Sequence, residues 1–186
     1  MKELKDYSGE FSPGLKLEDF SKDALLRLFH TTAKLYLGMD GVWHSLIREK
    51  FGEQVARDLD VEVWSRATPI EISRTMAAMN IQGDDVATLF KVFQCDPGTA
   101  GVGDVECELK DKNHGIYTVK RCSSLEHFER HGDIEGIKWA CEVIDTAMWT
   151  ATTIPVNPKI KVTPLKRPPR KSKDEIACQW EFRLEG

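Results

Sequence analysis

The chain has 186 residues, of which 41% are hydrophobic and 30% are charged, and its formal net charge is −4. The length is sufficient for one domain with a hydrophobic core, and the balance is that of a globular protein. The negative charge argues against nucleic-acid binding by bulk attraction, and no apolar run is long enough to span a membrane.

The N-terminus and the cysteines indicate a cytoplasmic protein. The first residues carry no apolar segment of the kind found in secretory signals. Five cysteines, an odd number at wide spacing, argue against a disulfide framework. We therefore expect free thiols in a reducing compartment, where they serve as core residues, metal ligands or reactive groups.

Residues 1–20 are expected to form an irregular arm, and residues 21–95 a helical part. Hydrophobic spacing predicts five helices, over about 22–37, 42–51, 53–66, 68–80 and 84–94. Ser21 is the expected N-cap of the first helix, and Thr68 that of the fourth, with Pro69 following at its first position. The first helix has an apolar stripe, formed by Leu25, Leu26, Leu28, Phe29, Ala33, Leu35 and Tyr36.

Residues 96–186 are expected to form a β-β-α-α-β-β unit with an antiparallel sheet. Glycines within 98–103 indicate a loop, and alternation then predicts a hairpin. The expected elements are strands 104–110 and 116–121, helices 123–131 and 134–151, and strands beginning at Ile160 and Ile176. Ser123 is the expected N-cap of the first of these helices, and Gly132 ends it. The sequence thus predicts one α+β domain spanning residues 1–186.

Three cysteines and a carboxylate define the first candidate site. Cys122 directly precedes a predicted helix, whose N-terminal dipole favours a thiolate. Cys141 lies on the apolar stripe of the next helix, Asp145 lies one turn further on, and Cys178 points to the core face of the last strand. Two helices packed on the sheet would bring the three thiols together.

Two kinds of chemistry would suit this set of residues. Cys122, Cys141 and Cys178 with a carboxylate or an imidazole would suit zinc, or iron with an open coordination position. Alternatively, Cys122 is a nucleophile, with His127 or His131 as its base. The alternatives without a functional role are that Cys141 and Cys178 are small buried hydrophobic residues and that Asp145 lies at the solvent-exposed edge of its helix.

Other residues could bind a ligand. Trp43 and His44 in the helical part, and Tyr117 and Trp149 in the second part, are candidate ligand-binding residues, although aromatic residues more often belong to the core. The stretch from Lys159 to Lys173 carries seven basic residues and could hold an acidic partner or a phosphate. The alternative is a solvated loop that protects the edge of the sheet.

The order Arg121-Cys122, His131-Gly132, Cys141-Glu142, Asp145 and Cys178-x-Trp180-x-Phe182 resembles the C-terminal pattern of the L-2-amino-thiazoline-4-carboxylic acid hydrolase-like family. It is more distantly similar to the 4-vinyl reductase domains found in ligand sensors. The resemblance covers about residues 100–185. It implies an α+β domain that holds a small organic molecule between helices and sheet. The closely spaced C-terminal cysteine pair of the zinc-bearing sensors is absent, because only Cys178 is present.

The resulting hypothesis is a small-molecule-binding protein that hydrolyses a small cyclic or amide-like substrate. Cys122, Asp145 and His131 are its candidate catalytic residues. One alternative is a non-enzymatic ligand sensor or carrier with a structural metal. Another is an interaction module that uses the basic stretch. A small-molecule ligand is the expected partner, a homodimer is a further candidate, and neither nucleic acid nor a membrane is expected.

Overall fold

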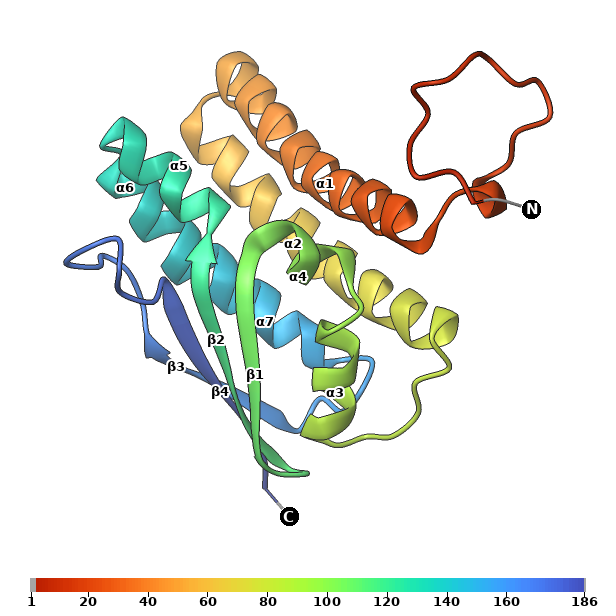
Figure 1. The fold of residues 1–186 in the computed structure, drawn as a ribbon. Coiled ribbons are helices and arrows are strands. Elements are labelled where there is room, and N and C mark those ends of the chain that lie inside the picture. The colour runs from red at the N-terminus through yellow and green to blue at the C-terminus, as the bar shows by residue number, and fades with distance from the viewer. Residues whose placement is uncertain (1–2, 186) are drawn as a thin grey trace.

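The computed structural model describes residues 3–185 and has the predicted α+β class (Figure 1). The first two residues of the predicted arm lie outside this range. The arm is irregular except for a 3-10 turn, η1 (Leu17–Asp19). The helices are α1 (Lys22–Phe51), α2 (Glu53–Ala78), α3 (Val86–Phe93), α4 (Pro97–Val102), α5 (Ser123–His131), α6 (Ile134–Lys138) and α7 (Asp145–Thr153). The strands are β1 (Gly103–Asp111), β2 (His114–Cys122), β3 (Ile160–Lys166) and β4 (Cys178–Leu184).

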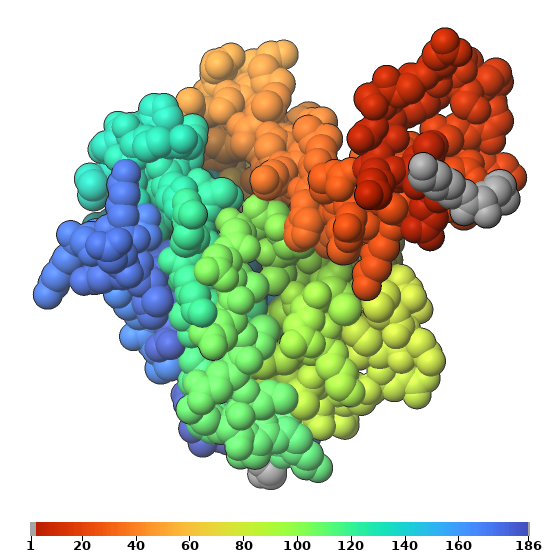
Figure 2. Space-filling view, in the orientation of Figure 1, coloured from red at the N-terminus to blue at the C-terminus, as the bar shows by residue number. Residues whose placement is uncertain are grey.

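The sheet has the order β1-β2-β4-β3, and all of its neighbouring strands are antiparallel. Tyr117 on the central strand β2 lies opposite Cys107 on β1 and Trp180 on β4. Helices α2 and α7 run behind the sheet, and α1 lies on the outer side of α2 (Figure 1). The N-terminal arm projects from the body beside the start of α1 (Figure 2).

An aromatic cluster forms the core between the sheet and the helices. The rings of Phe93, Tyr117, Trp149 and Phe182 meet at centroid distances of 4.8 to 5.9 Å. Trp180 joins them at 5.9 Å from Trp149. Because such large side chains each bury about 150–250 Å², this cluster is a main source of stability for the second part of the chain.

Two expected helix breaks are wrong. Gly38 and Gly41 lie inside α1, so predicted helices 22–37 and 42–51 are one helix. Pro69 lies inside α2, so Thr68 is a buried helical residue and not an N-cap. Each glycine in a helix interior costs about 1 kcal/mol relative to alanine, and proline about 3 kcal/mol. Packing of the long helices therefore outweighs these local preferences.

The predicted apolar stripe of the first helix is not its core face. The structure buries Ala33 and half-buries Tyr36, whereas Leu25, Leu28 and Leu35 are exposed, as are Leu26 and Phe29. The face of α1 toward the body instead carries several polar residues. Periodicity identified this helix correctly but assigned its buried side wrongly.

Most local predictions after residue 95 are confirmed, with two corrections. Residues 97–102 form α4 instead of a loop, because the Asp96 carboxylate accepts a hydrogen bond from the Thr99 N–H and caps the helix. Cys122, and not Ser123, is the N-cap of α5. Gly132 ends that helix in the left-handed conformation, with φ 65°. Predicted helix 134–151 is continuous but contains a π turn over Trp139–Ile144.

Candidate functional site

The structure brings Cys122, Cys141 and Cys178 into one group beside Asp145. The negative charge of Asp145 acts on all three thiols, and Cys141 is also influenced by the other two cysteines. The three belong to the same hydrophobic core, Cys122 at its half-buried margin. Residues from β2, the π turn and β4 therefore line one region, as the sequence suggested.

Local backbone structure fixes each sulfur. Cys122 ends β2, and its Sγ accepts a hydrogen bond of 3.5 Å from the Leu125 N–H in the first turn of α5. Cys178 begins β4, and its Sγ accepts one of 3.4 Å from the Trp180 indole N–H. The π turn holds Cys141 and is followed directly by Asp145. Such π turns are rare, and they occur frequently at functional sites.

The thiols are protonated near neutral pH. Burial raises the pKa of Cys178 to about 12 and also raises the pKa of Cys122 and Cys141. The hydrogen bond from Leu125 lowers the pKa of Cys122, but burial has the larger effect. Desolvation therefore opposes the expected thiolate at the start of α5 more strongly than the helix terminus favours it, and the thiolate stays a prediction.

Asp145 is the group of this site that titrates near neutrality. The residue as a whole is half-buried. Burial of its carboxyl raises the pKa of that group from the ordinary 3.8 to about 7. The charge of Arg167 lowers this pKa in part, and no hydrogen bond from residues 3–185 contributes. A carboxyl with such a pKa can take up and return a proton at physiological pH.

Arg167 completes the site, and the sequence reasoning did not single it out. Its guanidinium carbon lies 5.0 Å from the ring centre of Trp180, and its Nη2 donates a 2.6 Å hydrogen bond to Thr146 Oγ1. Its Nε is buried without a partner among residues 3–185. The only sequence signal was the basic stretch 159–173, which does not distinguish this arginine from its neighbours.

Two expected roles are not supported by the geometry. His131 lies on the exposed side of α5, and its Nδ1 is 2.8 Å from the carbonyl oxygen of His127, so it is not a base for Cys122. Within residues 3–185 no three His, Cys, Asp or Glu side chains are arranged to hold a metal ion. The three thiols lie near one another, but their arrangement is not that of a metal site. Zinc or iron at this place stays a prediction.

The predicted ligand-binding residues lie in different surroundings. Tyr117 and Trp149 belong to the aromatic core, 4.8 Å apart, and the buried Trp149 indole N–H has no partner among residues 3–185. His44 lies between the long helices, with Nδ1 3.1 Å from Asp60 Oδ2. Trp43 is exposed on α1. These four residues do not line one cavity.

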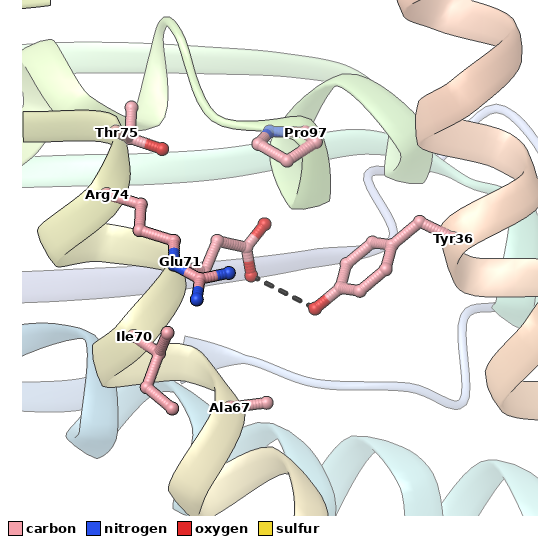
Figure 3. A pocket seen from close by; sticks show the side chains of 7 residues that line it. All are labelled: Tyr36, Ala67, Ile70, Glu71, Arg74, Thr75 and Pro97. Carbon is pink, nitrogen blue, oxygen red and sulfur yellow. Dashed lines mark hydrogen bonds between the residues drawn. The ribbon is translucent and has the colours of Figure 1, made fainter. Parts of the chain in front are cut away.

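A second group of polar residues joins α1, α2 and α4 (Figure 3). Tyr36 and Glu71 line a groove of about 400 Å³, together with Ala67, Ile70, Arg74, Thr75 and Pro97. The Glu71 carboxylate accepts hydrogen bonds from the Tyr36 hydroxyl at 3.3 Å and the Gly98 N–H at 3.0 Å. Burial and the nearby Asp96 raise the pKa of Glu71 to about 7. Asp96 and Glu71 both accept hydrogen bonds from backbone N–H groups of α4. This cluster of polar residues therefore holds the three helices together.

The basic stretch makes contacts within the chain. Arg170 donates two hydrogen bonds to the Glu129 carboxylate on α5, at 2.8 and 2.7 Å. Lys166 pairs with Glu175 at 3.0 Å, and Lys161 pairs with Glu185. The Arg170–Glu129 pair holds the loop between β3 and β4 against α5, whereas the Lys166 pair closes the loop and the Lys161 pair links β3 to the end of β4. These contacts give the stretch a structural role.

Comparison with known proteins places the chain in a family. Residues 18–184 match a family of unknown function, DUF6125. The chain belongs to DUF6125. The matched range contains α1 to β4, and with them Cys122, Asp145 and Arg167. No curated protein and no solved structure matches the chain. No helix among residues 3–185 of this DUF6125 member combines the length and the apolar character needed to cross a membrane.

Proposed function

We propose that this protein binds a small organic acid between Arg167 and Asp145. The observation that carries the proposal is the state of Arg167, whose buried Nε donor has no partner among residues 3–185. A buried N–H without an acceptor is costly, and a guanidinium matches a carboxylate in geometry and charge. A carboxylate of a ligand is the group best suited to accept a hydrogen bond from this Nε.

The surroundings define the rest of the ligand. The Trp180 ring lies beneath the guanidinium, and the buried thiols of Cys141 and Cys178 are weakly polar neighbours of Asp145. Asp145 offers a carboxyl that is partly protonated at neutral pH. These groups suit a compact molecule that carries one carboxylate and a ring or amide with an exchangeable proton.

Hydrolysis is the reaction that this arrangement supports, because Asp145 has a pKa near 7 beside uncharged thiols. In the proposed reaction, the Asp145 carboxylate takes a proton from a water molecule as the water oxygen attacks an amide-like carbon. The proton then passes to the leaving nitrogen. Arg167 holds the carboxylate of the substrate, and the thiols line the site without ionising. A carrier or sensor would use the same binding contacts without the attack by water.

The resemblance supplies the first compound to test, L-2-amino-thiazoline-4-carboxylate, a small cyclic acid. We expect it to raise the melting temperature of the protein and to bind in calorimetry, whereas the corresponding carboxamide does not. Arg167→Gln should lose this binding, and Arg183→Gln, at an exposed arginine on β4, should keep it. Binding that is the same in wild type and Arg167→Gln would refute the proposed anchor.

Catalysis is tested separately with Asp145→Asn. This variant should still bind the acid through Arg167 but release no ring-opened product, as followed by chromatography. If wild-type protein binds the compound without turning it over, the carrier function remains.

The free state of all five cysteines also supports a cytoplasmic location, which we include in the proposal.

A further inference from the structure

The outward face of α1 carries an apolar stripe with coiled-coil spacing. Leu25, Leu28, Thr32, Leu35, Met39, Val42 and Leu46 follow one another at alternating intervals of three and four residues. Six of the seven are apolar, and these six expose between 37% and 69% of their surface. Alternating spacing of this kind is the pattern by which one helix packs along another.

The area of this face matches a stable protein interface. Phe29 and Trp43 flank the stripe and are also exposed. Because a large apolar residue carries about 150–250 Å² of surface, the eight apolar residues together expose on the order of 800 Å². That is about the area that each partner contributes to a standard interface. A monomer rarely leaves a continuous apolar surface of this size in water.

We infer that the partner is a second copy of this chain, whose α1 packs antiparallel against the first. The stripe is centred near Leu35 and Met39, so a two-fold axis there pairs the stripe with itself. The end of the stripe favours the antiparallel direction. Glu49 follows Leu46 by three residues and so continues the stripe toward the C-terminal end of α1. Parallel packing would place Glu49 against Glu49 of the second copy, whereas antiparallel packing about this axis places it opposite Leu25 and keeps the two carboxylates apart.

The test is the mass of the full chain in solution, measured by sedimentation equilibrium over the micromolar range. We expect twice the mass of one chain for the wild type and a single-chain mass for Leu35→Glu combined with Met39→Glu. Because both residues are exposed in one copy, circular dichroism of this variant should show unchanged helix content. The matched control, Leu109→Glu with Leu165→Glu, changes two exposed leucines on β1 and β3 and should remain a dimer.

The direction is tested by cross-linking under an added oxidant. Chains with Leu28→Cys should form disulfides mainly with chains that carry Leu46→Cys, and only slowly with themselves. Each variant linking mainly to itself would overturn the antiparallel arrangement. A wild-type chain that is monomeric across the micromolar range, or a dimer that survives Leu35→Glu with Met39→Glu, would overturn the inferred interface.

Discussion

The guanidinium of Arg167 lies over the indole ring of Trp180, 5.0 Å from its centre. Trp180 stands on β4, two residues after Cys178, and its own N–H points to the sulfur of that cysteine. The strand therefore supplies both a platform for the arginine and one of the three thiols. This relationship connects the core of the domain to the group that we propose binds a ligand.

Trp180→Phe should destabilise the protein more than Trp149→Phe. Both residues are buried in the aromatic cluster, but only the Trp180 N–H has a hydrogen-bond acceptor within residues 3–185. We expect the first substitution to lower the free energy of unfolding by about 2 kcal/mol, and the second by about 1 kcal/mol. Urea denaturation measures both. Equal losses, or the reverse order, would contradict this description of the core.

Asp145→Asn should flatten the dependence of stability on pH. The folded state raises the pKa of Asp145 from 3.8 to about 7, so the folded chain holds this proton more tightly than the unfolded chain. The stabilisation is complete below about pH 4 and is lost as pH rises from there through 7, on the order of 4 kcal/mol, because one pKa unit corresponds to about 1.4 kcal/mol. Unfolding curves at several pH values would show the smaller slope in the variant. Parallel curves for both proteins would count against the raised pKa.

The buried thiols should resist alkylation. Burial raises the pKa of Cys122, Cys141 and Cys178, so few of them are ionised at pH 7, and the thiolate is the reactive form. Iodoacetamide labelling followed by peptide mass spectrometry should show slow modification of all three in the folded protein and fast modification in urea. Rapid labelling of Cys122 at pH 7 in the folded protein would restore it as a nucleophile.

Glu129→Gln should destabilise the fold by about 2 kcal/mol, because it leaves the Arg170 guanidinium without its carboxylate. The Arg170 side chain is 2% exposed in its pair with Glu129. Glu126→Gln is the matched control, since its partner, Arg121, is mostly exposed and such pairs contribute at most about 1 kcal/mol. Chemical denaturation that gives the same small loss for both variants would argue against a structural role for the pair.

The sequence predicted the second part of the chain well because its signals are local. Alternation in 176–185, the turn over 111–115 and the glycine at 132 are each signals of nearby backbone. Strand β4, the hairpin and the end of α5 follow them, with β4 beginning two residues later than predicted. The helical part was predicted less well. Gly38, Gly41 and Pro69 are strong local breakers, but long-range packing keeps both helices continuous.

The candidate site was predicted in composition but not in chemistry. The three cysteines and Asp145 come together because they lie on elements that the pattern identified. The protonation of Cys122 could not be inferred, since it depends on how deeply tertiary packing buries the sulfur. The same holds for Arg167, which becomes part of the site only through its contact with Trp180, and for Glu71, which acquires Tyr36 and Asp96 from distant segments.

The proposed site depends on an electrostatic interaction between the Asp145 carboxyl and the Arg167 guanidinium in partly buried surroundings. Carbon-13 NMR of protein labelled at the aspartate side-chain carboxyl measures this directly, with Asp145→Asn used to assign the signal. We predict that Asp145 titrates near pH 7 in the wild type and at a higher pH in Arg167→Gln, because the positive charge that lowers its pKa is then lost. A titration near pH 4 that is unchanged in Arg167→Gln would contradict the proposed site.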